Sequence, residues 1–172
     1  KPVYKTGEIF PTDTVPVISA APSGGGGRVV NLFKWGFPGH GSNASVIINA
    51  RSETLEEKHS FKKIVRTIRC LVPASGFFEW KRTGSGKEKY LIRPGNHKMF
   101  YMAGLYNTFT DKNLNLYTGF VIITTAAVAA MSEIHSRMPV IIEKGEEKIW
   151  LGPDYKTLLE PYRQPLALQK IN

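Results

Sequence analysis

The sequence predicts a single α+β domain, residues 1–172, whose core is a mainly antiparallel, bent or barrel-like β-sheet with short helices around it. Three observations support this fold class. The chain has 172 residues, which is the length of one domain with a sizeable buried core. Segments rich in β-branched and aromatic residues recur along it. They do not alternate regularly with helices, which argues against a doubly wound parallel sheet.

The first third of the chain predicts three strands and one helix. Residues 14–20 alternate as a half-buried strand does, and residues 28–36 return after a glycine-rich turn at 21–27. A third strand is expected at 45–51. Thr54 and Glu57 then have the spacing of a capping box, which predicts a short basic helix over about 54–66.

The rest of the chain predicts more strands, then short helices. An exposed hairpin tip is expected at 82–88, and a helix of small residues over 126–134 that ends at His135. The final pattern predicts two short helices. In order, the expected strands are 70–74, 77–81, 89–94, 98–106, 116–126 and, as the last one, 139–143, and the final helices are 145–152 and 153–162.

The composition points to a polyanionic partner. The net charge of +9 favours contact with nucleic acid, although no long run of cations is present. The sequence contains neither an apolar run long enough for a bilayer nor a signal peptide, and its single cysteine fits a cytoplasmic location, associated with the nucleoid if the source is bacterial. The four histidines lack the spacing of zinc ligands. We therefore expect no metal, no cofactor and no membrane, and a monomer.

Two stretches place polar side chains where a strand should be apolar. Asn49 and Arg51 share one face at the end of a strand, where an amide could bind a sugar oxygen and a guanidinium a phosphate; alternatively, they only end the strand. Glu79 lies between Phe78 and Trp80. On an internal face, burial would raise its pKa and make it a candidate acid or base; on an external face it would be an ordinary solvent-exposed side chain of the strand.

Two further stretches allow similar alternatives. Thr124 and Thr125 end a long apolar strand, where they could cap the following helix or contribute to a site. His135 lies after a helix and is a natural proton shuttle, but a single histidine is more often structural. Cys70 begins an apolar strand, which favours a buried and inert thiol over a nucleophile.

Taken together, seven segments resemble the SOS-response-associated peptidase (SRAP) family in order and approximate spacing. The resemblance runs from about Pro11 to about Trp150, and its most specific motifs are N-A-R, F-x-E-W and I-H-x-R-M-P. The segments are WGFPG (35–39), INARSET (48–54), RCLVPASGFFEWK (69–81), YMAGLY (101–106), ITTAA (123–127), IHSRMPVII (134–142) and WL (150–151).

The resemblance implies binding of single-stranded DNA and covalent capture of abasic sites. In the family, an amino-terminal cysteine exposed by autocatalytic loss of the initiator Met attacks the opened sugar aldehyde. Its α-amine forms a Schiff base and its thiol closes a thiazolidine. A peptidase, hydrolase or lyase classification in DNA damage and the SOS response would follow.

By position, the resemblance gives this chain three catalytic candidates. Asn49 would hydrogen-bond the crosslinked residue, Glu79 would transfer a proton beside the amine, and His135 would protonate or orient the sugar. The implied DNA-binding residues are Trp35, Arg51, Thr125 and Arg137.

The sequence departs from the family pattern at its start. It begins at Lys1 without the family's Cys-Gly-Arg, so we expect the cysteine-containing segment to be omitted, truncated or lost. Two alternative functions stay open: a non-catalytic nucleic-acid-binding module, and a thiol peptidase that uses Cys70 and His135.

Overall fold

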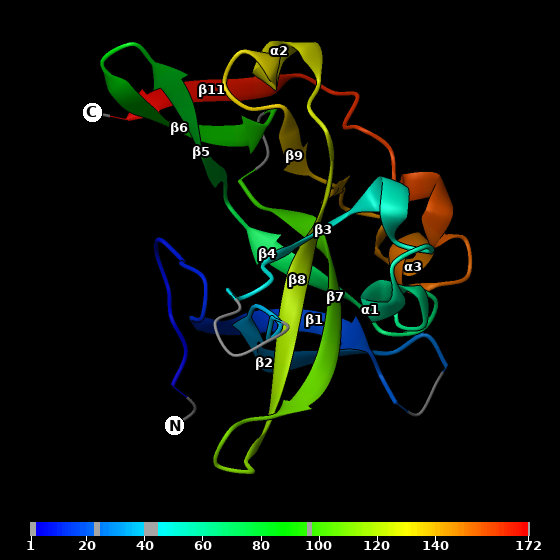
Figure 1. Ribbon diagram of the computed structural model, residues 1–172. Helices are drawn as coiled ribbons and strands as arrows, with labels where there is room; N and C mark the ends of the chain where they lie inside the picture. The colour runs from blue at the N-terminus through cyan, green and yellow to red at the C-terminus, as the bar shows by residue number, and fades with distance from the viewer. Residues whose placement is uncertain (1–2, 23–24, 40–44, 96–97, 172) are drawn as a thin grey trace.

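The computed structural model describes residues 3–22, 25–39, 45–95 and 98–171, and two β-sheets form most of this part. The larger sheet has eight strands among these residues, and the smaller sheet has three. Figure 1 shows the smaller sheet at one end of the molecule and a long β7–β8 hairpin extending from the other. The larger sheet contains β1 (Thr14–Ala20), β2 (Arg28–Trp35), β3 (Asn49–Arg51), β4 (Arg69–Ala74), β7 (Phe100–Thr110), β8 (Leu116–Ala126), β9 (Arg137–Pro139) and β10 (Ile141–Ile142); the smaller contains β5 (Phe77–Thr83), β6 (Gly86–Pro94) and β11 (Leu166–Ile171).

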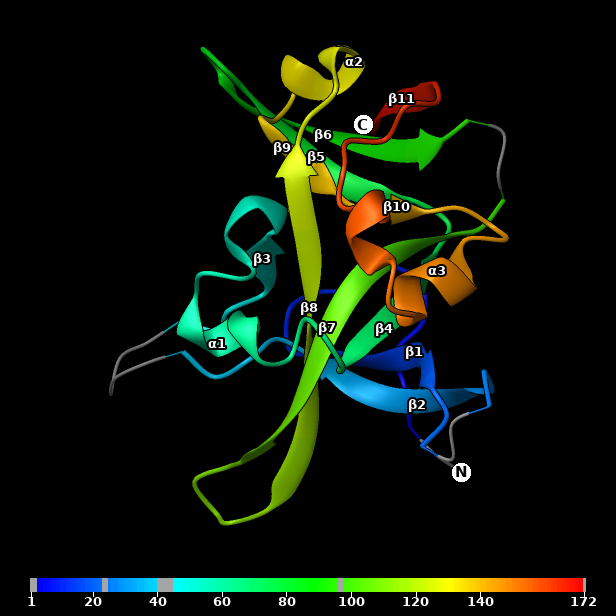
Figure 2. The same cartoon turned by 90° about the vertical axis from the view of Figure 1, so that its right-hand side faces the viewer.

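The larger sheet closes on itself, which confirms the predicted barrel-like core. Strands β7, β4, β1, β2 and β8 are hydrogen-bonded in this order, and β8 pairs again with β7. The pairings are antiparallel except for β2 and β3, which each run parallel to β8. The helices are short and peripheral (Figure 2). They are α1 (His59–Lys62), α2 (Ala129–Ser132), α3 (Glu147–Leu151) and the 3-10 turns η1 (Ser52–Thr54) and η2 (Tyr155–Leu158).

The central strands are buried on both faces. In β4, Cys70 belongs to one hydrophobic cluster and the next residue, Leu71, to a second cluster on the other face. In β8, Phe120 and Ile122 join the first cluster while Val121 and Ile123 join the second. Because successive side chains of a strand point to opposite faces, strands covered on both faces have continuous apolar runs.

The parallel crossing of β2 and β8 requires a glycine at position 119. A Cβ atom there would lie 2.5 Å from the backbone oxygen of Gly36. The Gly36 N–H also donates to the Phe120 oxygen at 2.7 Å, which holds the two backbones together. Neither backbone can move away from the other without breaking this hydrogen bond.

We therefore expect Gly119→Ala to lower the free energy of unfolding by about 1–3 kcal/mol, as overpacking does. Urea denaturation would measure the change. Gly84→Ala is the matched control, because no atom of the part of the chain that the structure describes lies within 4 Å of a Cβ at that hairpin position. Equal stability of the two variants would contradict the argument.

All four predicted helices are shorter than expected. The helix predicted over 145–152 is reduced to α3, and the one predicted over 153–162 is reduced to the 3-10 turn η2. The region 54–66 contains only α1 and the end of the preceding 3-10 turn. Lys58 is the N-cap of α1, and the buried Thr54 hydroxyl has no hydrogen-bond partner among the described residues, so the predicted capping box is wrong. Burial of apolar side chains such as Leu55 and Val65 determines this segment instead. The helix predicted over 126–134 covers only α2, because Ala126 still pairs with Arg137 in the β8–β9 ladder.

Three strand predictions also need correction. The strand expected at 45–51 is regular only in β3. The strand expected at 139–143 is divided into β9, which pairs with β8, and β10, which pairs with β7. It is not the last strand, because β11 follows and pairs with β6. The mostly exposed side chains of β11 give no hydrophobic alternation that would reveal it. The predicted turn at 21–27 lies partly outside the described residues.

Candidate active site

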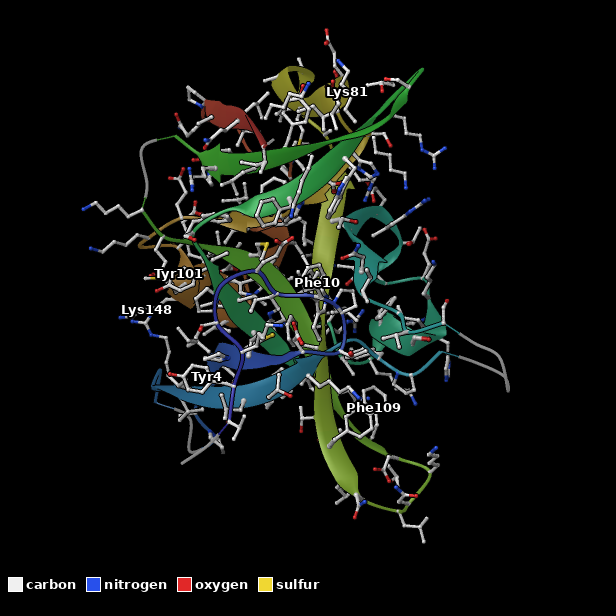
Figure 3. All side chains as sticks on the ribbon, turned by 90° about the vertical axis from the view of Figure 1, so that its left-hand side faces the viewer. Tyr4, Phe10, Lys81, Tyr101, Phe109 and Lys148 are labelled. Carbon is white, nitrogen blue, oxygen red and sulfur yellow. The ribbon has the colours of Figure 1, made fainter. Side chains whose placement is uncertain are left out.

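A partly open cavity of about 1110 Å³ lies between the two sheets and the amino-terminal segment. Figure 3 shows this segment crossing in front of the larger sheet, with Phe10 over its middle and Tyr4 beside β2. The cavity wall includes residues of β3 and β5 and the loop before β9. Segments far apart in the sequence therefore share one wall, and Asn49, Glu79 and His135 are all part of it.

Glu79 and His135 form an acid–base pair on this wall. The Glu79 Oε1 atom lies 3.7 Å from the His135 Nδ1 atom, and their side chains are 24% and 44% exposed. Burial raises the pKa of Glu79 above its ordinary value, and the His135 charge and the Trp80 backbone N–H offset only part of this effect. Glu79 thus occupies the internal position that its alternation with Phe78 and Trp80 allowed.

The backbone of Arg137 holds the imidazole of His135. The Arg137 N–H lies 3.1 Å from Nδ1 and can donate to it when this nitrogen is unprotonated. The Arg137 carbonyl oxygen lies 3.0 Å from the same nitrogen and can accept its proton when it is protonated. Both protonation states therefore have a hydrogen-bond partner at Nδ1, and Nε2 is the ring nitrogen left for exchange with a substrate.

Asn49 and Arg51 lie on the same exposed face of β3, as the sequence predicted, with buried Ala50 between them. Parallel pairing with Ile122 and Thr124 of β8 fixes this strand. Both side chains line the cavity, and the Arg51 guanidinium forms no ion pair with a carboxylate of the described residues. Such a cation at the rim of a cavity suits a phosphate.

Trp35 also lines the cavity, and its own contacts fix its orientation. Its indole N–H donates to the Ile48 oxygen at 3.1 Å, and its ring stacks on Phe120 with 6.4 Å between centroids. The hydrogen bond ties the end of β2 to the residue before β3. Trp35 therefore supports the strand that carries Asn49, in addition to presenting an aromatic surface.

Thr125 does not lie where the sequence prediction placed it. It is 3% exposed, and its neighbour Thr124 is the threonine on the cavity wall, because adjacent strand residues face opposite sides. Neither threonine caps α2, whose N-cap is Val128 without a side-chain cap bond. The capping interpretation is wrong, and the structure does not bring Thr125 to the site.

Arg137 lines the cavity, but most of its guanidinium is already occupied. Its two terminal nitrogens donate to the two carboxylate oxygens of Glu53 at 2.6 and 2.9 Å. One of them also donates to the Thr124 carbonyl oxygen at 2.7 Å. Arginine has five N–H groups, and the Arg137 Nε is buried. With respect to the described residues, one N–H of Nη1 is therefore left for a phosphate.

Cys70 cannot take part in chemistry at this site. It is 0% exposed, lies in the hydrophobic core and is not part of the cavity wall. Burial raises the pKa of its thiol far above the usual range, so no thiolate forms near neutral pH. The alternative of a thiol peptidase built on Cys70 and His135 is therefore wrong.

The structure adds cavity residues that the sequence prediction did not include. Trp80 is 42% exposed, and Phe78 and Trp80 lie under the Lys89 ammonium, which is 4.1 Å and 5.7 Å from their ring centroids. Lys89 also forms an ion pair with Glu8 of the amino-terminal segment. The alternation of Phe78 and Trp80 around Glu79 was the sequence pattern that could have indicated them.

Among the described residues, no group of His, Cys, Asp or Glu could hold a metal ion, and no helix is long and apolar enough to cross a membrane.

The fold and the site together define the class of protein. It is a barrel-like domain with a carboxylate–imidazole acid–base pair in a cavity that has a cation at its rim. The comparison with protein families then identifies the particular family. The model of the SOS response associated peptidase (SRAP) family matches residues 2–172. This chain belongs to that family.

Known proteins agree with this membership. The chain is 44% identical over 124 residues to Abasic site processing protein YoqW of Bacillus subtilis, covering 67% of this chain and 55% of that protein. It is 36% identical over 141 residues to Abasic site processing protein HMCES of Gallus gallus, covering 70% and 41%. The chain thus spans about half the length of these curated relatives.

The fold also matches solved structures. A crystal structure of a Bacteroides thetaiotaomicron protein superposes with a TM-score of 0.80 at 28% identity, covering 94% of this chain and 75% of that one. A Bordetella bronchiseptica protein gives a TM-score of 0.78 at 21% identity, covering 95% and 86%, and supports the fold alone.

Proposed function

We propose that this chain provides the DNA-binding and acid–base residues of an enzyme that captures abasic sites in single-stranded DNA. The observation that carries the proposal is the Glu79–His135 pair, 3.7 Å apart on the wall that also contains Asn49 and Arg51. The names of the curated relatives supply the substrate class. The net charge of +9 fits a polyanionic partner.

The nucleophile in this proposal is the amino-terminal cysteine that the SRAP resemblance implies, and Cys70, the only cysteine of this sequence, is not it. The α-amine adds to the sugar aldehyde, water leaves to give an imine, and the thiol adds to the imine carbon to close a thiazolidine. Glu79 takes the proton that the attacking amine must lose. His135 delivers a proton to the departing hydroxyl, and the Asn49 amide orients the adduct.

Glu79 and His135 would also transfer the protons when water cleaves the Met–Cys peptide bond, so that the Met carbonyl carbon gains the hydroxyl and the cysteine nitrogen gains the proton. The proposal includes this self-processing but no general proteolysis. It also includes action in the cytoplasm as a monomer.

The test is incubation of the full-length protein with single-stranded DNA that contains one abasic site, followed by denaturing electrophoresis. We expect a covalent product with the abasic strand and none with an intact strand. If the intact protein binds the DNA but forms no covalent product, the chain is a non-catalytic binding module and the proposal is wrong.

Arg51→Ala is expected to weaken binding of intact single-stranded DNA about threefold to tenfold and to reduce the slope of log affinity against log salt by about 0.7, as the loss of one phosphate contact requires. Fluorescence anisotropy at several salt concentrations measures both quantities. Arg66→Ala removes the same charge from an exposed side chain that pairs with Glu56 at 3.8 Å and lies outside the cavity wall. An equal loss of affinity in both variants would show a general charge effect instead of a contact at Arg51.

A further inference from the structure

Glu53 lies next to the proposed site and has no role in the proposed reaction. Its carboxylate receives both terminal nitrogens of Arg137, at 2.6 and 2.9 Å, as a bidentate pair. The Thr124 carbonyl oxygen accepts a further bond from the same guanidinium at 2.7 Å. Two acceptors from different elements therefore hold this side chain in one orientation.

The residue fixed in this way is the one whose backbone holds His135. The N–H and the carbonyl oxygen of Arg137 lie 3.1 and 3.0 Å from the His135 Nδ1 atom. A backbone that tilted would lose both contacts, and the Glu79–His135 distance would change with it. The anchored side chain and the backbone contacts belong to the same residue, so they act on the imidazole together.

We infer that Glu53 is a positioning residue, which anchors Arg137 and thereby keeps the His135 imidazole in an orientation that suits both of its protonation states. This inference rests on the proposed function. Glu53 does not contact the reacting atoms in it, and Arg137 presents to DNA only the part of its guanidinium that this pair leaves available.

The Glu53–Arg137 ion pair stays charged near neutral pH. The Arg137 guanidinium lowers the pKa of Glu53 to about 2, with burial opposing the shift. Glu53 therefore remains ionised wherever imidazoles change charge. The anchor does not weaken when His135 gains or loses its proton.

The test compares Glu53→Gln and Glu53→Asp with Glu56→Gln in the full-length protein. Glu56 is the matched control, because it is a similarly exposed carboxylate that pairs with Lys156 at 2.8 Å away from the cavity wall. The rate of covalent capture at saturating DNA and the affinity for intact DNA are measured separately. The nitrogen shifts of the His135 ring, recorded by NMR on the free protein, report the tautomer and the order of the ring without any reaction.

We expect Glu53→Gln to slow capture about tenfold to a hundredfold, because misplaced catalytic groups lose rate. Its affinity for intact DNA should be no weaker than that of Glu56→Gln. The His135 ring signals should shift or broaden in Glu53→Gln and recover in part in Glu53→Asp, which keeps the charge. Equal rates and unchanged ring signals in Glu53→Gln and Glu56→Gln would overturn the inference. If the unsubstituted protein forms no covalent product while Glu53→Gln still perturbs the ring, the proposed function fails and the positioning role stands.

Discussion

In the proposed reaction, replacing Glu79 with glutamine in the full-length protein is expected to slow abasic-site capture by about a hundredfold to ten-thousandfold, the usual contribution of a positioned acid or base. Glutamine preserves the shape of the side chain but cannot take a proton from an amine. The partner His135→Gln should fall in the same range, since each half of the pair depends on the other. Single-turnover crosslinking at saturating DNA measures the rate without the binding step.

The same Glu79→Gln variant should be more stable than the natural protein at neutral pH. Burial raises the pKa of Glu79 in the folded chain, so the folded state binds this proton more tightly than the unfolded state does. This stabilisation is fully present below the unfolded pKa, near 4.5, and is lost as the pH rises through the folded pKa. Above that pH the protein carries a partly buried charge that the glutamine variant lacks.

Thermal unfolding at pH 4 and pH 8 tests this sign. We expect Glu79→Gln and the natural protein to differ little at pH 4, and the variant to melt higher at pH 8. Glu57→Gln is the control, because it removes an exposed carboxylate outside the cavity wall. A slower reaction together with lower stability at pH 8 would indicate damaged folding instead of a lost base.

Most strands could be predicted from the sequence because the residue patterns that indicate them are local. The lack of regular alternation between strands and helices then favoured a barrel-like sheet. A strand buried on both faces, such as β8, has a continuous apolar run, and an Asn-Ala-Arg segment places two polar groups on one face of any strand that contains it. The alternation around Glu79 likewise offered the internal face as one of two possibilities. These properties do not depend on how distant segments meet.

The residues that escaped prediction depend on long-range contacts. Glu53 gains its importance from Arg137, 84 positions away, and neither residue identity indicates that pairing. Thr125 was the predicted DNA-binding threonine, but the pairing of β8 with β3 and β9 places Thr124 on the cavity wall instead. The helices were overestimated for the same reason, because packing of Leu55 and the β8–β9 ladder override local helix signals.

The largest expected loss of stability comes from Arg69, a buried cation that the sequence shows only as the residue before an apolar strand. It is 5% exposed, and its guanidinium donates to four backbone carbonyl oxygens. These are Trp150 (2.7 Å), Val65 (2.6 Å), Leu151 (3.1 Å) and Gly152 (2.6 Å). The same group lies 4.3 Å from the Tyr155 ring centroid, so one side chain joins the end of α3 to the segment before β4.

Arg69→Ala is therefore expected to lower the free energy of unfolding by about 3–5 kcal/mol, because it leaves several buried carbonyl oxygens without donors as well as a cavity. Arg69→Lys should restore only part of this, since an ammonium cannot reach acceptors arranged around a planar fork. Urea denaturation measures the change, and Arg66→Ala, an exposed neighbour, should stay within about 0.5 kcal/mol. A loss below about 1 kcal/mol in Arg69→Ala would mean that the carbonyls find water and that α3 does not depend on this cation. Because Arg69 lies outside the cavity wall, the variant should carry out the proposed capture of abasic sites at the unchanged rate wherever it remains folded, which separates this role from that of Glu79.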